Sequence, residues 1–257
     1  MATTASGALP VVLLHAFPLS RAMWQAQHAG LAEAAGIDLE LVTPDLVGFG
    51  DMPPTQEPPD LAWMAETVMR MLDQRGLRKV VLGGLSMGGY VAMEILRRRP
   101  SVAAALVLAD TKASADPEPA RQNRERIASL LEEREDPQVL VEEVLPALVS
   151  DHSRRTYPKV VDQVRELIEQ VDPAAAAWAQ RAMALRPDST QTLATADVPA
   201  LVVVGSQDQL SPVSEAEGMC TVLPQGRLEV VNGAGHLSAV EAPAVFNRVV
   251  GDFLRAL

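Results

Sequence analysis

The chain has 257 residues, of which 48% are hydrophobic and 21% are charged, and its formal net charge is −11. This length and composition are typical of a globular protein with a sizeable core, arranged as one large domain or two small ones. The excess of acidic residues argues against a nucleic-acid or anionic-membrane partner, because the field of the whole protein would repel both.

The single cysteine, Cys220, allows no internal disulfide, which fits a reducing cytoplasm. Residues 1–10 contain neither the basic nor the apolar region of a signal peptide. No apolar run is long enough to span a membrane. We therefore expect a cytoplasmic protein with no membrane partner.

The first third of the chain alternates between apolar runs and helical patterns. Residues 11–14 form a short apolar run typical of a buried strand, and a second strand is expected at 39–43. Ser20 could cap a helix that ends near residue 35. Residues 52–60 carry four prolines and predict an irregular loop. A helix over 61–74 should end at Gly76.

The segment Gly84-Leu85-Ser86-Met87-Gly88 lies between an apolar run at 80–82 and a helical pattern. A G-x-S-x-G turn between strand and helix is the expected setting of a nucleophile elbow. Its serine must adopt a strained backbone, usually with positive φ. Side chains two residues before and after it would collide, so glycine is needed at both places.

A strand over 102–109 ends at Asp110, after which the pattern changes. No glycine occurs between Gly89 and Gly205. We predict helical segments near 120–134, 137–149, 156–170 and 173–185, punctuated by prolines. The charged runs at 121–126 and 132–136 are interpreted as solvated helix faces. The domains are therefore a core of residues 1–111 and 188–257 and a helical cap of residues 112–187.

Sheet character returns with strands over 200–204 and 227–231, each followed by a helical pattern at 213–223 and 241–257. Strands that alternate with helices predict a parallel, doubly wound α/β sheet, here of about six strands. In such a sheet, ligands bind at the carboxyl ends of the strands. Ser86, Asp208 and His236 each follow a predicted strand at that end.

These three residue types can perform nucleophilic catalysis together. A serine hydroxyl is a weak nucleophile and needs a base to take its proton. Histidine titrates near working pH, and a carboxylate can fix its tautomer and stabilise the imidazolium. The order Ser86, Asp208, His236 is the order of the triad in α/β-hydrolases. Asp110 remains a rival to Asp208, because it ends a strand on the same edge.

Taken together, these motifs resemble the α/β-hydrolase superfamily over nearly the whole chain. The matching segments are the elbow, Gly205-x-x-Asp208-x-x-x-Pro212 and Gly233-x-Gly235-His236. The chain is similar to small cytoplasmic serine esterases, cofactor-free haloperoxidases (perhydrolases), 3-oxoadipate enol-lactonases and acyl-carrier methyl esterases. The serine argues against dehalogenases, whose nucleophile here is aspartate.

The resemblance implies an oxyanion hole formed by the backbone amides of Phe17 and Met87. The chain departs from the family at Ala16, where relatives carry glycine after the histidine, and at Met52, where they carry serine. His15 is interpreted as a structural hydrogen-bonding residue. The short segment before residue 11 predicts that the usual N-terminal hairpin is missing.

We expect a serine hydrolase that cleaves a small, mostly apolar carboxylic ester or lactone through an acyl-enzyme. Perhydrolase activity at the same site and a non-catalytic ligand-binding protein are the alternatives. No cofactor or metal is implied, and the protein is expected to be a monomer or homodimer. The candidate pocket residues, besides Phe17 and Met87, are Trp24, Met52, Trp178, Leu210 and Leu237.

Overall fold

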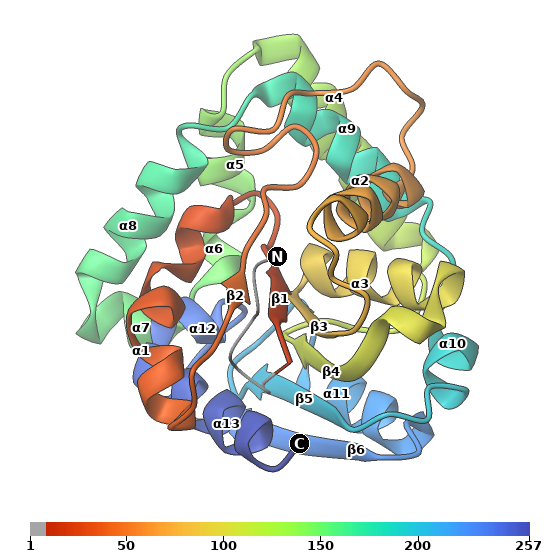
Figure 1. Cartoon of the computed structure of the whole chain (residues 1–257). Helices are drawn as coiled ribbons and strands as arrows, with labels where there is room; N and C mark the ends of the chain where they lie inside the picture. The colour runs from red at the N-terminus through yellow and green to blue at the C-terminus, as the bar shows by residue number, and fades with distance from the viewer. Residues whose placement is uncertain (1–8) are drawn as a thin grey trace.

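Six parallel strands form one sheet in the order β2-β1-β3-β4-β5-β6 in the computed structural model, which describes residues 9–257 (Figure 1). This confirms the predicted α/β-hydrolase fold with a parallel sheet of six strands. The strands are β1 (Val11–Leu14), β2 (Leu41–Val42), β3 (Val80–Leu85), β4 (Ala103–Ala109), β5 (Ala200–Gly205) and β6 (Gly226–Val231).

The centre of the sheet is buried on both faces. Its register brings the polar residues that follow the strands to one edge. Every residue of β1, β3 and β5 is buried. Leu85 of β3 pairs with Ala109 of β4, and Ala109 pairs with Val203 of β5. Because parallel strands end at the same edge, the loops that follow β3, β4, β5 and β6 meet there.

Helices cover both faces of the sheet (Figure 1). One layer contains α1 (Gln25–Ala35), which packs against α13 (Pro243–Arg255), with α12 (Ser238–Glu241) beside them. The other contains α2, α3, α10 and α11, which contact one another in that order. Their bounds are α2 (Leu61–Gln74), α3 (Met87–Arg98), α10 (Thr190–Ala194) and α11 (Val213–Val222). Short 3₁₀ turns occupy Arg21–Trp24 and Pro100–Val102.

The residues between β4 and α10 form six helices and, within the described chain, no strand. We call residues 112–187 the helical insertion. Its helices are α4 (Glu118–Arg134), α5 (Gln138–Glu143), α6 (Leu145–Leu148), α7 (Asp151–Thr156), α8 (Pro158–Ile168) and α9 (Pro173–Ala184). The two longest, α4 and α9, pack against each other.

The helices differ from the sequence prediction mainly where prolines interrupt the pattern. The segment predicted as one helix over 137–149 is divided at Val144, two residues before Pro146. Tyr157, which precedes Pro158, separates α7 from α8. Proline lacks the amide that a continuing helix needs, and it disfavours helical backbone at the preceding residue.

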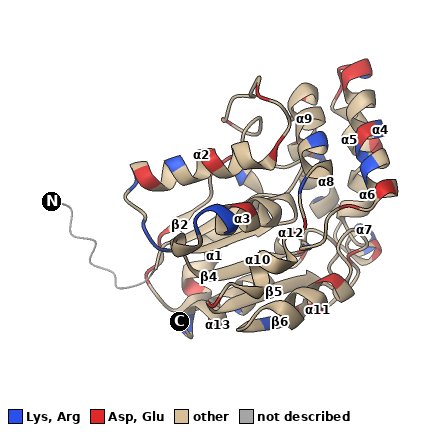
Figure 2. Ribbon diagram, turned by 90° about the vertical axis from the view of Figure 1, so that its right-hand side faces the viewer, with Lys and Arg blue, Asp and Glu red and all other residues tan. Residues whose placement is uncertain are grey.

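Charged residues lie mainly outside the sheet. Figure 2 shows acidic and basic residues close together on the outer helices, and among the strands of the described chain only β6 contains charged residues, Arg227 and Glu229. Within residues 9–257, no helix is long and apolar enough to cross a bilayer. The expectations that no signal peptide and no leading hairpin are present concern mainly residues 1–8, which lie outside the described residues. Within residues 9–257, no antiparallel hairpin occurs.

The contact between the start of α3 and the end of β1 depends on Gly88. A Cβ at Gly88 would lie 2.1 Å from the carbonyl oxygen of Leu14, and a Cβ at Gly84 would lie 2.2 Å from the Gly88 carbonyl carbon. These distances are far below van der Waals contact. The steric reason expected for both glycines of the elbow is therefore present in the structure.

We predict that Gly88→Ala lowers the free energy of unfolding by roughly 1–3 kcal/mol, because rigid backbone must move to admit the methyl group. Gly218→Ala is the matched control, since a Cβ there meets nothing within 4 Å in the exposed part of α11. That change should stabilise the protein by up to about 1 kcal/mol. Urea unfolding of both variants measures the difference, and an unchanged Gly88→Ala protein would contradict the packing argument.

Candidate active site

Ser86 lies on the turn between β3 and α3 in a strained conformation. Its φ is 53° and its ψ is −113°, a region that residues other than glycine rarely adopt. The surrounding backbone fixes the turn from both sides. The Ser86 amide donates to the Ala109 carbonyl at 2.9 Å, and its carbonyl accepts from the Thr111 hydroxyl at 2.9 Å. The neighbouring strand β4 thus positions the serine.

The structure brings His236 and Asp208 to Ser86. His236 Nε2 lies 2.7 Å from Ser86 Oγ, and His236 Nδ1 lies 2.9 and 2.8 Å from the two carboxylate oxygens of Asp208. A carboxylate only accepts hydrogen bonds, so Nδ1 must carry the proton that it donates to Asp208. The other ring nitrogen then faces the serine hydroxyl as an acceptor. All three side chains are buried.

Asp208 is held in place by the loop that follows β5. Its Oδ1 accepts hydrogen bonds from the amides of Leu210 at 2.8 Å and Ser211 at 3.0 Å. These bonds fix the carboxylate before any substrate binds. The bond from Leu210 is that of an Asx turn, in which a short aspartate side chain accepts from the amide two residues on.

Asp110 occupies the same edge of the sheet but makes other contacts. It accepts from the Gly205 amide at 2.8 Å and from the amide of Ser238 at 3.1 Å, and the Ser238 hydroxyl also donates to it. Burial, and then the nearby charge of Asp208, raise the pKa of Asp110 well above its ordinary value. Of the two candidate acids, Asp208 contacts the ring of His236, whereas Asp110 joins the ends of β4 and β5 to the chain after His236.

His15 makes structural hydrogen bonds in the loop after β1. Its Nδ1 donates to the Ala16 carbonyl at 3.0 Å, and its Nε2 accepts from the Leu46 amide at 2.9 Å. Burial lowers the pKa of His15 from 6.5 to about 4, so the ring is neutral at pH 7. This neutral ring ties the Ala16–Phe17 segment to the loop that follows β2.

The two residues expected to supply backbone amides lie next to the serine. Met87 is the first residue of α3, where the amide has no acceptor within the helix. Phe17 follows β1, and its ring meets Phe49 edge-on at 6.0 Å between ring centroids. Phe17, Ser86 and His236 line one cavity.

Glu241 is a buried carboxylate that the sequence did not single out. Its Oε1 accepts from the amides of Gly235 at 2.9 Å and Leu237 at 3.3 Å, on either side of His236. Its Oε2 accepts from the Ser150 amide at 2.9 Å. The same side chain therefore connects the His236 loop with the helical insertion. In the sequence, Glu241 is marked only as an acidic residue five positions after His236, at the start of the helix predicted over 241–257.

A cavity of about 260 Å³ contains Ser86 and His236 and is roofed by the helical insertion. Its lining divides into two kinds of surface. The apolar lining comes from the β1 loop, from the chain after Asp208 and largely from the insertion: Phe17, Ile127, Val144, Ala147, Leu148, Met183 and Leu210. The polar lining includes Tyr90, Lys112, Asp116, Asn123, Arg124, Glu143, Gln180 and Gln209.

Two of the expected pocket residues, Phe17 and Leu210, line this cavity, and the others lie elsewhere. Trp24 is fully buried and packs on Phe246, with 6.1 Å between ring centroids. Leu237 and Met87 are fully buried in the core, and the half-buried Met52 lines no described cavity near Ser86. Large apolar side chains near a motif more often pack into the core than face a ligand.

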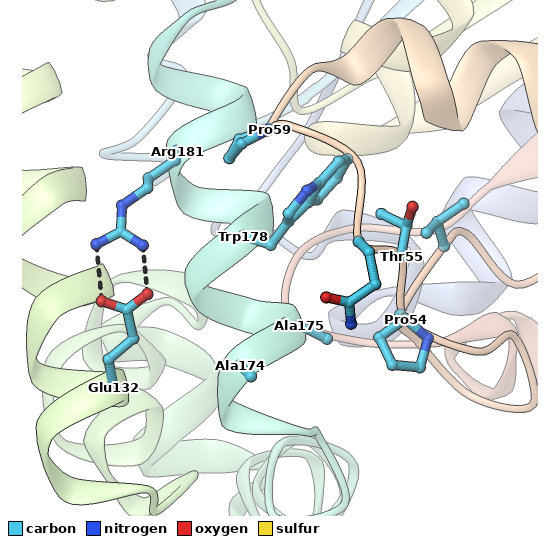
Figure 3. A pocket seen from close by; sticks show the side chains of 11 residues that line it. Pro54, Thr55, Pro59, Glu132, Ala174, Ala175, Trp178 and Arg181 are labelled. Atoms are coloured by element: carbon cyan, nitrogen blue, oxygen red, sulfur yellow. Dashed lines mark hydrogen bonds and ion pairs between the residues drawn. The ribbon is translucent and has the colours of Figure 1, made fainter.

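Trp178 lines a second cavity of about 270 Å³ (Figure 3). This cavity lies between α9 and the proline-rich loop, and the indole Nε1 donates to the Glu57 carbonyl at 2.7 Å. Arg181 pairs with Glu132 at its rim, as the dashed lines in Figure 3 show. The tryptophan thus joins the insertion to the 52–60 loop and is not part of the serine cavity.

The charged run at 121–126 is not entirely solvated, which corrects the sequence interpretation. Asn123 and Arg124 line the serine cavity together with Ala120 and Ile127. Positions 120, 123, 124 and 127 share one face of a helix. That spacing was visible in the sequence, but polar residues on an inward face carry no hydrophobic signal.

Among residues 9–257, no group of three His, Cys, Asp or Glu side chains is placed to hold a metal ion.

A family model described as the alpha/beta hydrolase family matches residues 11–249. The chain belongs to this family. A thermophilic esterase from Thermogutta terrifontis, solved with malate bound, has a TM-score of 0.91 and 38% identity, covering 98% of this chain and 91% of that one. Pimeloyl-(acyl-carrier protein) methyl ester esterase of Aromatoleum aromaticum is 28% identical over 95% of this chain and 98% of its own length.

The chain also matches the dihydrolipoyllysine-residue acetyltransferase component of the acetoin cleaving system of Pseudomonas putida. The two are 28% identical over 97% of this chain, which spans 64% of that protein's length. Together the comparisons identify an esterase-like alpha/beta hydrolase.

We predict that the buried neutral His15 makes this hydrolase sensitive to acid. Its folded-state pKa of about 4 lies below the unfolded value of 6.5, so its stabilising contribution is complete above pH 6.5 and is lost as the pH falls toward 4. Between pH 7.5 and pH 5 the wild type should lose about 2 kcal/mol more unfolding free energy than His15→Gln. Denaturant unfolding at both pH values measures this, and equal pH dependence in the two proteins would refute it.

Glu241→Gln tests the link between the insertion and the His236 loop. A glutamine has one accepting oxygen, so it must lose the bonds to Gly235 and Leu237 or the bond to Ser150. We expect p-nitrophenyl acetate hydrolysis to fall roughly 10- to 100-fold, because His236 would shift beside the Ser86 hydroxyl and a small misplacement of reacting groups weakens catalysis strongly. Glu217→Gln on exposed α11 is the control. Unchanged activity in Glu241→Gln would show that Glu241 does not position His236.

Proposed function

We propose that this alpha/beta hydrolase is a serine carboxylic-ester hydrolase that uses Ser86 as nucleophile, His236 as base and Asp208 as the orienting acid. The observation that carries the proposal is the hydrogen-bond chain from Asp208 through His236 to the Ser86 hydroxyl, buried at the floor of a cavity. The strained elbow and the first amide of α3 beside it support the same assignment.

In the first half of the reaction, Ser86 Oγ attacks the ester carbonyl carbon while His236 Nε2 takes the hydroxyl proton. A new C–O bond forms, and the carbonyl π electrons move onto the oxygen. When the tetrahedral intermediate collapses, the bond to the leaving alkoxide breaks and the imidazolium gives it the proton. The products of this half are an alcohol and an acyl-serine.

Water completes the cycle through the same groups. His236 takes a proton from a water molecule, whose oxygen attacks the acyl carbon. The second tetrahedral intermediate expels Ser86, which regains its proton from the imidazolium, and the carboxylic acid leaves. Asp208 stabilises the imidazolium in both halves without accepting the proton itself.

The oxyanion of both intermediates would rest on the amides of Met87 and Phe17. Supporting this role, Met87 provides an unpaired amide at the N-terminus of α3, where the helix dipole favours negative charge. His15 and Phe49 hold the Phe17 segment through a hydrogen bond and a ring contact. Fixed donors of this kind need no reorganisation when charge develops.

The helical insertion would act as a cap that selects the substrate. It supplies most of the lining of a cavity of about 260 Å³, which suits a small ester. A lactone presents the same acyl carbon to Ser86 as an open-chain ester. One related structure also fits a small ligand, since it is an esterase with malate bound.

Ser86→Ala is expected to abolish fluorophosphonate labelling and to reduce p-nitrophenyl acetate hydrolysis by at least about a thousandfold, because the nucleophile and its base act as a unit. His28→Ala is the control, since exposed His28 contacts Thr43 far from the cavity lining. Labelling by mass spectrometry and initial rates give both readouts. A wild-type protein that neither labels at Ser86 nor hydrolyses a panel of short esters would support the non-catalytic alternative.

A further inference from the structure

Three cationic side chains surround one buried carboxylate at the polar end of the serine cavity. Asp116 accepts from Arg186 Nη2 at 2.8 Å and from Arg124 Nε at 2.5 Å, and Lys112 Nζ lies 3.5 Å from it. Burial alone would raise the pKa of Asp116, but Arg186 and Arg124 outweigh it and hold the pKa well below its ordinary value. The carboxylate is therefore ionised at any pH at which the protein works.

Arg186 is the structural member of this cluster. It is buried, it donates to the carbonyls of Met183 at 2.9 Å and Ser114 at 2.9 Å, and it stacks on the ring of Tyr90 at 4.1 Å. With Asp116 it forms a buried ion pair. It does not line the cavity, whereas Lys112 and Arg124 do.

The cluster has more positive than negative charge. Lys112, Arg124 and Arg186 contribute three positive charges, against Asp116 and the nearby Glu215, which accepts from Ser114. Glu143, the other acid of the cavity lining, is paired with Arg126. The cluster therefore has an excess of one positive charge, although the whole protein has a net charge of −11.

Lys112 is the cation whose hydrogen-bonding capacity is unused. Its side chain is 15% exposed, and in the described part of the chain its ammonium makes the ion pair to Asp116 but no hydrogen bond. Arg124 uses Nε for Asp116 and Nη1 for the Gln180 side chain at 3.0 Å, which leaves Nη2 free among the contacts of the described residues. A partly buried cation without a full set of acceptors favours binding of an anion.

We propose that Lys112 and Arg124 form a carboxylate-binding subsite, so that the preferred substrate is a small ester or lactone with a free carboxylate. This inference rests on the proposed function. A single carboxylate charge matches the one excess positive charge of the cluster, whereas a phosphate dianion would leave an excess of negative charge. The apolar lining at Ile127, Ala147 and Leu148 would contact the methylene groups between the ester and the carboxylate.

The test compares monomethyl glutarate with methyl glutaramate, in which a neutral amide replaces the carboxylate. The wild type should prefer the acid ester in kcat/KM by at least about tenfold, since hydrogen bonds to charged groups are the stronger ones. In Lys112→Met the ratio of the two kcat/KM values should fall about 10- to 100-fold, mainly through KM. Lys159→Met, on exposed residues of α8, is the control and should keep the wild-type ratio.

A binding measurement gives a second readout that needs no turnover. Free glutarate should bind Ser86→Ala protein in calorimetry, and adding Lys112→Met should weaken it at least about tenfold. An unchanged ratio together with unchanged glutarate binding in the Lys112→Met proteins would overturn the subsite. In that case Ser86 labelling and p-nitrophenyl acetate hydrolysis would still be present. Loss of both in the wild type would instead overturn the proposed function and the subsite with it.

Discussion

The left-handed turn at Ser86 is the constraint on which the rest of the site depends. A serine with φ of 53° is unfavourable in isolation, so the neighbouring elements must hold it there. Its amide and carbonyl bind β4 and Thr111, while Gly84 and Gly88 allow backbone to approach where any side chain would clash. This turn presents the hydroxyl to His236 and leaves the first amide of α3 beside it.

The two aspartates at the edge of the sheet illustrate how similar positions acquire different roles. Asp208 faces the imidazole of His236 and accepts hydrogen bonds from two backbone amides, which hold its carboxylate against that ring. Asp110 is fully buried near the charge of Asp208, and both its burial and that charge raise its pKa. Its bonds to Gly205 and Ser238 connect three segments of the site.

Much of this arrangement could be predicted from the sequence because it depends on local rules. The six strands, the glycines of the elbow and the polar residues at the strand ends follow from apolar runs and turn chemistry. The order of the residues favoured Asp208 over Asp110, but the contact of Asp208 with His236 could not follow, since it depends on where two side chains point. The polar end of the cavity was missed for a related reason. Arg124 lies in a charged run, and only the packing of α4 on α9 turns that residue inward.

The bond between Glu241 and the amide of residue 150 has a consequence for how such proteins diversify. At residue 150 the insertion is attached to the His236 loop by two bonds, because the amide donates to Glu241 and the serine hydroxyl donates to the Gly233 carbonyl at 2.8 Å. Proline would remove the first bond because it has no amide hydrogen to donate, and a side chain without a donor would remove the second. Selection or a protein engineer can therefore exchange the inward face of α4 to accept new substrates while the attachment keeps the histidine loop in register.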